Sequence, residues 1–264
     1  MIMPALKYNE DNVTSLKSLT NRLNLNAKYS KFDFHSWVRK SYCLIPGMDI
    51  LDVGCGNGAQ IFDFINIIGS DGSISGLDIS KESIEEIKQK SVKYKNIDVI
   101  AADMNNLKNI IKNQFKIKRY DLAHATYALA YAADPIGILD SMRLSLKKTG
   151  RLIITSPIDP NSLRELAKKL GKPLPKYDSI GRFPKEILEP YFRSYFYNVK
   201  IEITKNVLAI TNSEDVINFY RNTGYHDSEI EIEITKYAKL EIERKGFFGF
   251  EKNNFMIIGE NQIF

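Results

Sequence analysis

The sequence contains few cysteines and no long apolar run, and each shortage excludes a class of protein. Its 264 residues include two cysteines, Cys43 and Cys55, which are too few for a disulfide framework and favour a reducing, cytoplasmic location. No apolar run approaches the roughly 20 residues that a membrane helix needs, so we expect no membrane span. Residues 1–12 place Asn and acidic side chains where a secretory signal needs an apolar core, so we expect no such signal.

The remaining composition is that of a globular protein with an excess of positive charge. Hydrophobic residues make up 44% of the chain and charged residues 26%, which is enough for a substantial core. A net charge of +5 is typical of some proteins that bind nucleic acid or acidic lipid. The lysines are scattered through every segment, without a basic tail or a basic helix, and this distribution argues against a nucleic-acid partner.

From residue 50 onward, apolar runs alternate with helical patterns. Strands are expected at 50–53, 73–77, 97–101, 120–126, 151–155 and 195–204, and helices at 59–68, 80–90, 134–147 and 159–170. This alternation predicts an α/β fold with a mostly parallel sheet and helices on both faces.

The outer segments are read from their turn residues and their aromatic residues. Gly171–Pro184 is rich in Gly and Pro and is expected to be a loop or lid. A later helix is expected from a cap at Ser213 to Arg221. Another is expected around Ile230–Leu240, although Glu229–Ile234 also alternates like a strand. Lys252-Asn253-Asn254 has the composition of a turn, which predicts a closing hairpin. No linker divides the chain into independent domains.

The strongest motif is Asp52-Val-Gly54-Cys-Gly56-Asn-Gly58, which follows a strand and opens a helix. Glycines allow the backbone to approach a ligand closely, and the helix N-terminus adds oriented N–H groups. The same spacing also fits the dinucleotide fingerprint of nicotinamide enzymes.

Three acidic residues favour S-adenosylmethionine over a nicotinamide. Asp78, 20 residues after Gly58, suits a ribose in either case. Asp52 precedes the first glycine, where it suits a cationic ligand end and would sit poorly beside a pyrophosphate. Asp103 follows the third strand and is expected near an adenine amino group.

With these motifs in order, the chain resembles the class I SAM-dependent methyltransferases. The matching runs are ILDVGCGNGA, GLDIS, AADMNNL, YDLAHATYALAYAADP and LKKTGRLIITSP, which cover roughly residues 48–157. The resemblance implies a Rossmann-like fold, with a seven-stranded, mostly parallel sheet, an antiparallel C-terminal hairpin strand and a helical N-terminal cap. It also implies a single methyltransferase domain over 1–264, divided into a cap (1–45), a SAM-binding core (46–156), a lid or insert (157–190) and C-terminal strands and helices (191–264).

The resemblance assigns roles to residues of this sequence. Gly54, Cys55, Gly56 and Gly58 would lie along the methionine part of the cofactor, with Asp52 acting from the strand end. Asp78 would hold the ribose and Ile79 would pack on the adenine. Asp103 and Met104 would contact the base, and Ala125 and Thr126 would face the sulfonium.

The chain departs from many relatives after the fourth strand. Thr126 stands where they have Asn or Asp, and Ala130-Tyr131 stands where they have a histidine pair. The Asn/Asp-Pro-Pro-aromatic signature of amino-directed nucleic-acid methyltransferases is absent. The atom that receives the methyl group therefore stays open.

Candidate catalytic residues are few, because the chain has three histidines. His124 lies near the carboxyl end of a strand, and His35 lies in the aromatic N-terminal segment. With Tyr127, they are the candidates for a base or a substrate-orienting group, each weighed against an ordinary structural role. No cluster has the spacing of metal ligands.

The sequence thus predicts a SAM-dependent methyltransferase, a monomer or homodimer, that acts on an O, N or C nucleophile of a small molecule. The alternatives are an RNA or protein methyltransferase of the same fold and a SAM-binding protein that does not methylate. A nicotinamide oxidoreductase is the nearest rival by motif alone.

Overall fold

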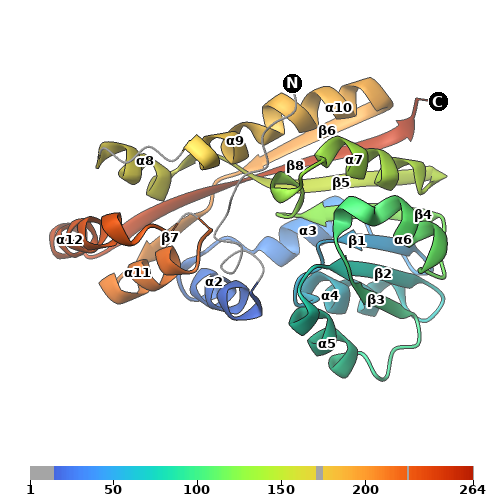
Figure 1. Ribbon diagram of the computed structural model, residues 1–264, viewed down its shortest axis with the longest axis horizontal. Helices are drawn as coiled ribbons and strands as arrows, with labels where there is room; N and C mark the ends of the chain where they lie inside the picture. The colour runs from blue at the N-terminus through green and yellow to red at the C-terminus, as the bar shows by residue number, and fades with distance from the viewer. Residues whose placement is uncertain (1–14, 171–174, 225, 264) are drawn as a thin grey trace.

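The computed structural model describes residues 15–170, 175–224 and 226–263, and it is built around one mixed sheet (Figure 1). The strand order is β3-β2-β1-β4-β5-β8-β6, with β7 paired to β8 off this path. The strands are β1 (Asp49–Val53), β2 (Ser73–Asp78), β3 (Ile97–Ala101), β4 (Tyr120–Thr126), β5 (Leu146–Asn161), β6 (Phe196–Thr204), β7 (Val207–Ile210) and β8 (Phe248–Gln262).

The first five strands are parallel, and β8 runs antiparallel to both β5 and β6. β1 lies between β2 and β4, so the strand order reverses at β1. Ligands of open α/β sheets bind beyond the carboxyl ends of the strands at such a reversal. The glycine motif follows β1 at this point.

Helices cover both faces of the sheet and one end of it. The helical elements are α2 (Leu16–Tyr29), α3 (Phe34–Tyr42), α4 (Ala59–Ile68), α5 (Lys81–Lys90), η1 (Met104–Asn106), α6 (Leu107–Asn113), η2 (Leu129–Tyr131), α7 (Pro135–Leu144), α8 (Ser162–Lys169), α9 (Pro175–Phe183), η3 (Pro184–Leu188), α10 (Glu189–Tyr195), α11 (Ser213–Arg221) and α12 (Ser228–Lys245).

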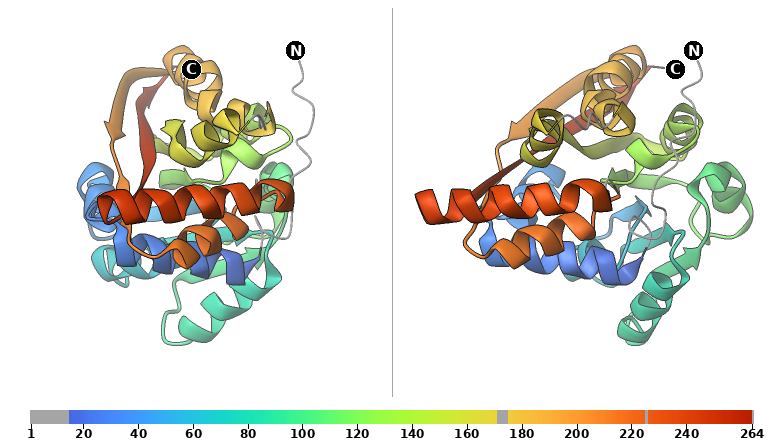
Figure 2. Two further views of the ribbon diagram at one scale, coloured as in Figure 1. Left: turned by 90° about the vertical axis from the view of Figure 1, so that its left-hand side faces the viewer. Right: turned by 60° about the vertical axis from the view of Figure 1, so that its left-hand side comes forward.

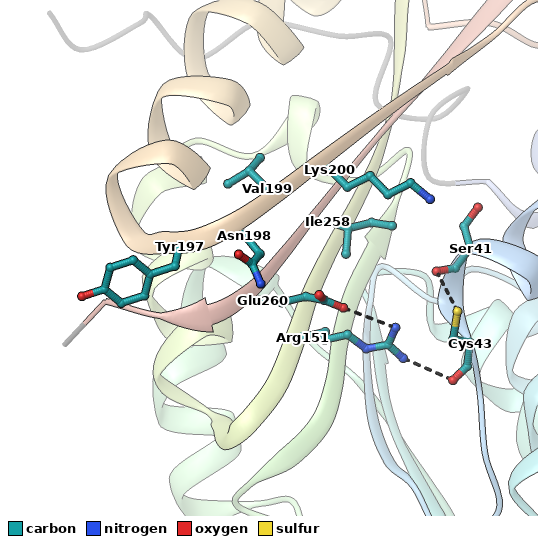
Figure 3. A pocket seen from close by; sticks show the side chains of 9 residues that line it. All are labelled: Ser41, Cys43, Arg151, Tyr197, Asn198, Val199, Lys200, Ile258 and Glu260. Carbon is teal, nitrogen blue, oxygen red and sulfur yellow. Dashed lines mark hydrogen bonds and ion pairs between the residues drawn. The ribbon is translucent and has the colours of Figure 1, made fainter.

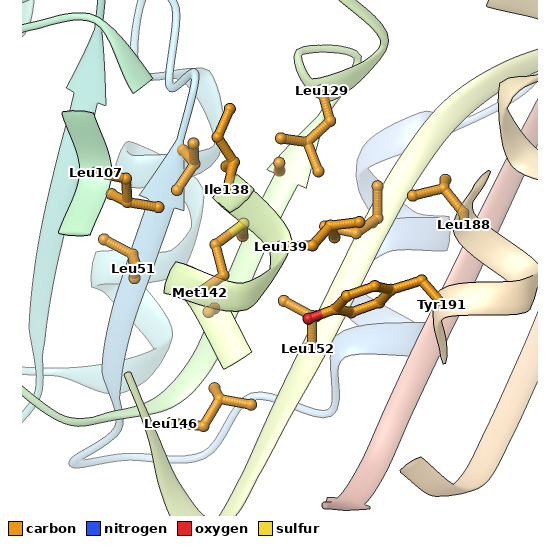
Figure 4. Packing of buried hydrophobic residues seen from close by; sticks show 14 of the residues in the cluster. Leu51, Leu107, Leu129, Ile138, Leu139, Met142, Leu146, Leu152, Leu188 and Tyr191 are labelled. Atoms are coloured by element: carbon orange, nitrogen blue, oxygen red, sulfur yellow. The ribbon is translucent and has the colours of Figure 1, made fainter. Parts of the chain in front are cut away.

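Two apolar clusters hold these helices to the sheet. On one face, α6, α7 and α10 pack against β4 and β5 through residues such as Ile138, Leu139 and Leu152 (Figure 4). On the other face, α3, α4 and α5 pack through residues such as Tyr42 and Phe64. Nearly every side chain of β1 is buried, and successive side chains point to opposite faces: Leu51 and Val53 join the first cluster and Ile50 the second. This is expected for a sheet that is enclosed on two sides.

A third cluster lies beyond the carboxyl edge of the parallel strands. The first half of β8 extends past that edge, pairs with β7 and packs against α2, α8, α11 and α12. Figure 2 shows α2, α11 and α12 stacked side by side in this outer layer. The chain therefore places helices on both sides of the strand ends where the glycine motif lies.

Most of the expected elements are confirmed. β3, β4 and α4 have the predicted bounds, and Ser80 caps α5 by accepting a hydrogen bond from the Ser83 N–H. α11 ends at Arg221 as predicted, but its cap is Asn212 instead of Ser213. The cap is helical over α2 and α3, while residues 1–14 lie outside the described part. These elements could be predicted because strand and helix periodicities are both clear in the part of the chain where strands and helices alternate.

The predicted closing hairpin is wrong. β8 runs without a turn through Lys252, Asn253 and Asn254, which pair with β5 on one side, and Asn254 pairs with Thr204 of β6 on the other. Partner strands on both edges satisfy the backbone there, and this tertiary pairing outweighs the turn preference of the asparagines. The sheet has eight strands instead of seven, because β7 was also missed.

Three helix boundaries are also corrected. β5 continues through Asp159-Pro160 to Asn161, whose side chain accepts from the Leu163 N–H and so begins α8. The expected loop at Gly171–Pro184 is helical from Pro175, because Ile180 and Phe183 are buried on one side; residues 171–174 lie outside the described part. α7 ends at Leu144 rather than near Lys147, which already belongs to β5.

A search of the described helices finds none with both the length and the apolar character required to cross a bilayer.

Gly259 tests the packing of β8 against the helix layer. A Cβ at Gly259 would lie 2.6 Å from the Phe196 ring, so we expect Gly259→Ala to destabilise the protein by about 1–3 kcal/mol through overpacking. Gly249 of the same strand meets nothing closer than 3.5 Å, so Gly249→Ala is the matched control and should change stability little. Urea unfolding followed by circular dichroism measures both, and equal effects would contradict this packing.

Candidate functional site

The loop between β1 and α4 has a backbone that requires glycine. Gly54, Gly56 and Gly58 have φ angles of +78°, +53° and +78°, in the left-handed region that favours glycine. A Cβ at Gly54 would lie 2.4 Å from the Ala128 Cβ, and one at Gly56 would lie 3.0 Å from Leu19 of α2. The loop is thus held between the chain after β4 and the N-terminal cap.

Asp78 ties this loop to the end of β2. One carboxylate oxygen accepts from the Gly56 N–H at 2.9 Å, and the other accepts from the Ser80 N–H at 2.9 Å. The carboxylate keeps further lone pairs, and the side chain is half-buried. The next residue, Ile79, leaves 56% of its surface exposed at the same strand end. An acid beside an exposed apolar side chain fits a ribose that carries an aromatic base.

Asp103 stands at the end of β3. Its Oδ1 caps η1 by accepting from the Asn105 N–H and the Asn105 amide, each at 2.8 Å. Oδ2 has no hydrogen-bond partner among the described residues, and the side chain is exposed, so this oxygen is available to an amino group of a ligand. Met104 packs partly against the core and carries no polar atom for binding.

Asp52 and His124 form a buried pair beneath the strand ends. They are partners in the register of β1 and β4, and Asp52 Oδ1 lies 3.6 Å from His124 Nε2, which is too long for a hydrogen bond. Burial, reinforced by the Asp78 charge, raises the pKa of Asp52 to about 8. Burial lowers the pKa of His124 to about 3. Both groups are therefore mostly uncharged at neutral pH.

The histidines that the sequence singled out do not meet at the glycine loop. His124 has no exposed surface, and its ring packs against Tyr42 and Phe64. His35 is half-exposed on α3 and lies 3.4 Å from Asp63 of α4. Ala125 is fully enclosed in the core. Cys55 is buried within the loop, and Thr126 lies closer to the strand edge.

Three polar side chains close to the strand ends were missed from the sequence: Tyr42, Thr155 and Gln60, which lie near the predicted Thr126. The Tyr42 hydroxyl faces Thr126, Thr155 and Gln60, which partly offset the effect of burial, but the pKa of Tyr42 is still raised to about 12. None of these side-chain groups makes a well-formed hydrogen bond. Thr126 and Thr155 are register partners at the carboxyl ends of β4 and β5. Their shared position at the two strand ends is the sequence signal that could have pointed to Thr155. Unpartnered polar atoms here fit a site that binds a polar ligand.

Tyr127 connects the strand end to the outer layer. It has a φ of +56°, and its N–H donates to the Thr155 carbonyl at 2.8 Å. Its ring stacks on Phe34 of α3 at 5.9 Å, and its hydroxyl donates to the Asn254 side chain. The ammonium of Lys252 lies 5.2 Å from the centre of the same ring. Phe34, Asn254 and Lys252 were not singled out in the sequence, because they come from distant segments.

A surface groove lies elsewhere on the described part of the chain. It is lined by Ser41, Cys43, Arg151, Tyr197, Asn198, Val199, Lys200, Ile258 and Glu260 (Figure 3). Arg151 pairs with Leu122 near the start of β4, so this groove lies at the amino ends of the parallel strands. It is therefore separate from the glycine loop. The described residues contain no group of three or more His, Cys, Asp or Glu placed to hold a metal ion.

A family model of a methyltransferase domain matches residues 44–222, which span the glycine loop, Asp78, Asp103 and the ends of β4 and β5. The chain belongs to this methyltransferase domain family. Membership of this family agrees with the Rossmann-like sheet. It supports the interpretation of the glycine motif as that of a methyltransferase and not of a nicotinamide enzyme.

Several curated relatives of this chain are named as methyltransferases that act on small molecules. The aklanonic acid methyltransferase DauC of Streptomyces is 29% identical over 43% of this chain and 50% of that protein. The nocamycin O-methyltransferase of Saccharothrix syringae is 27% identical over 46% and 42%. This chain thus matches half or less of their length. The demethylmenaquinone methyltransferase of Staphylococcus epidermidis is 23% identical over 77% and 83%.

Solved structures share the fold of this chain. The YcgJ protein of Bacillus subtilis has a TM-score of 0.57 at 15% identity, covering 87% of this chain and 98% of that one. The [4+2]-cyclase SpnF has a TM-score of 0.53 at 16% identity, covering 94% and 95%. At these identities the likeness concerns the fold alone, and a cyclase among the neighbours means that fold does not decide the reaction.

The raised pKa of Asp52 predicts a pH-dependent stability. Between pH 3.8 and about 8 the folded state keeps a proton that the unfolded state releases, so this residue lowers stability as pH rises. Asp52→Asn removes that loss, so its free energy of unfolding relative to the unmodified protein should rise by up to about 1.4 kcal/mol per pH unit.

Urea unfolding of the ligand-free protein between pH 6.5 and 8 checks this, because protonation of His124 in the unfolded state, where its pKa has the ordinary value of 6.5, is common to both proteins and cancels in the difference. The exposed Asp71 gives the control: Asp71→Asn should show no such slope. A difference between Asp52→Asn and the unmodified protein that stays flat with pH would contradict the burial of a protonated Asp52.

Proposed function

We propose that this protein transfers a methyl group from S-adenosylmethionine to a nucleophilic atom of a small molecule. The observation that carries the proposal is the arrangement at the strand ends. A left-handed glycine loop, a ribose-type acid at Asp78, an exposed apolar Ile79 and an acid with a free oxygen at Asp103 follow three adjacent strands. These groups fit an elongated ligand with an amino-acid end, a ribose and an adenine.

The residues would divide the cofactor between them in strand order. Gly54, Cys55, Gly56 and Gly58 would hold the amino-acid end, and their backbone fits because a Cβ would fill the space or clash with neighbours. Asp78 would accept from the ribose hydroxyls, and Ile79 with Met104 would enclose the adenine. Asp103 would accept from its amino group. When bound, S-adenosylmethionine supplies an electrophilic methyl group, which is the reactive chemistry of the site.

The chain itself would orient the acceptor and exclude water. Leu19 of α2 lies over Gly56, and Phe34 of α3 stacks on Tyr127, so the cap covers the loop from one side. α9 contacts η2 and β5 from the segment 157–190, which we propose as the lid. Enclosure of this kind fixes two reactants in line and removes solvent. Thr126 and Tyr127 border the space between the cap and the lid.

The buried pair leaves little room for a histidine base. His124 is uncharged and enclosed, so we assign it to packing against Tyr42 and Phe64 beneath the loop. His35 lies beside Asp63. Asp52 in turn would stabilise the cationic amino-acid end of the cofactor across the loop. We propose an acceptor that arrives as a ready nucleophile or is deprotonated by solvent.

A small-molecule acceptor is supported by the relatives, which are named for aklanonic acid, nocamycin and demethylmenaquinone. Oxygen is the favoured nucleophile, because one relative is named as an O-methyltransferase. Two free cysteines support a reducing, cytoplasmic location. A second candidate is a cofactor-binding protein that catalyses another reaction, which the cyclase neighbour of the same fold favours.

Calorimetric titration with S-adenosylhomocysteine tests the cofactor assignment. Asp78→Asn should weaken binding by about 1–3 kcal/mol, roughly 5- to 150-fold, because the charged acceptor of the ribose hydroxyls is lost. Asp71→Asn makes the same charge change in the turn before β2, at the opposite edge of the sheet, and should leave affinity unchanged.

The rival cofactor is tested in the same instrument. Binding of NADH in place of S-adenosylhomocysteine would refute the proposal. Equal affinities of Asp78→Asn and Asp71→Asn would refute the role of Asp78.

A further inference from the structure

Lys252 occupies an unusual position for a lysine. It lies on β8 where that strand passes beyond the carboxyl edge of the parallel strands, in register with Asn161 of β5. Its backbone N–H donates to Asn206, which fixes the strand at this point. The side chain is half-buried and points to Tyr127, with 5.2 Å between the ammonium and the ring centre. A strand outside the family's glycine motif therefore delivers a cation to the end of β4.

No acidic side chain of the described residues neutralises this cation. The adjacent Glu251 is paired with Lys205 at 3.0 Å and accepts from Asn253 at 2.9 Å. The charged group that acts on Lys252 is the Arg22 guanidinium of α2, which has the same sign. Burial and this guanidinium lower the pKa of Lys252 to about 8.

An enclosed ammonium next to a second cation is costly unless something compensates it. The Tyr127 ring offsets part of that cost, since cation–π contacts are worth about 0.5–2 kcal/mol. The ring itself is fixed by Phe34 on one face and by Asn254 at its hydroxyl. Lys252 is thus held in place by neighbours, while no counter-ion comes from the residues that the structure describes. This is the arrangement expected of an anion-binding group.

We propose that Lys252, held by Tyr127, binds an oxyanion of the methyl acceptor, a carboxylate or a phenolate. The inference rests on the proposed function, because it takes the space beside Thr126 and Tyr127 as the acceptor side of the site. It narrows the acceptor to molecules that carry a negative charge. Arg22 adds to the positive potential that such a molecule meets as it enters from the side of α2.

A different role for the same lysine is a general base that removes a proton from a neutral acceptor. That role needs the neutral amine to face a neutral ligand, whereas an anion-binding group becomes more firmly protonated when its ligand arrives. The two roles therefore predict opposite changes in the pKa of Lys252 between the free and the occupied site.

The test is a titration of the lysine itself, followed by NMR of ¹³C-dimethylated protein saturated with S-adenosylhomocysteine. Lys252→Arg assigns the resonance by its absence. Sodium benzoate is the probe, and benzamide is its neutral counterpart. We expect the Lys252 resonance to titrate near pH 8 without benzoate and to shift upward by about one pKa unit or more with it. Benzamide should cause no shift.

Lys205 provides the internal control, because it is an exposed lysine close to the same strand and is already paired with Glu251. Its resonance should respond equally to the two probes. A Lys252 pKa that is unchanged by benzoate, or lowered by it, would overturn the proposal.

A calorimetric measurement on the same samples distinguishes failure of the proposed function from failure of the anion-binding role of Lys252. Lys252→Met and the control Lys205→Met should both bind S-adenosylhomocysteine like the unmodified protein. If the unmodified protein fails to bind it, the proposed function is wrong. If it binds normally and benzoate leaves Lys252 unaffected, the proposed function stands and the anion-binding role alone is refuted.

Discussion

The attachment of the glycine loop to the end of β2 is the constraint on which the rest of the site depends. The N–H groups of Gly54 and Cys55 donate to the Leu77 carbonyl, and that of Gly56 donates to the Asp78 carboxylate. These bonds hold the loop in left-handed conformations, so that α4 begins at Gly58 and the cap can rest on the loop through Leu19. Asp78 thus holds the loop with the same carboxylate that we propose for the ribose.

Beneath that loop, two buried polar side chains lower the stability of the folded protein. Asp52 and His124 are buried side by side without a hydrogen bond between them, and burial keeps both largely uncharged at neutral pH. A core of apolar residues in their place would be more stable. Their position at the end of β1, below the expected amino-acid end of the cofactor, gives this cost a function: a cationic ligand is the group that would favour ionisation of Asp52.

Local periodicity in the sequence was sufficient to predict most elements of the parallel half of the sheet. The strands around β1 to β4, the caps at Ser80 and Asp134 and the acids at 52, 78 and 103 could all be read from spacing. What failed depends on partners distant in the chain. Asn253 and Asn254 read as a turn until β5 and β6 pair with them, and Lys252 became a site residue because β8 passes Tyr127. The Tyr42–Thr155 cluster likewise joins two segments more than a hundred residues apart.

We propose that one ligand lies across the ends of β1, β2 and β3 and presents its reactive atom to the space between Tyr127 and Lys252. A crystal structure with bound S-adenosylhomocysteine tests this most directly. We predict the ribose on Asp78, the adenine against Ile79 near Asp103, and the sulfur directed toward Thr126 and Tyr127. A ligand in the groove at the opposite edge of the sheet, or one with its adenine on the glycine loop, would contradict the account.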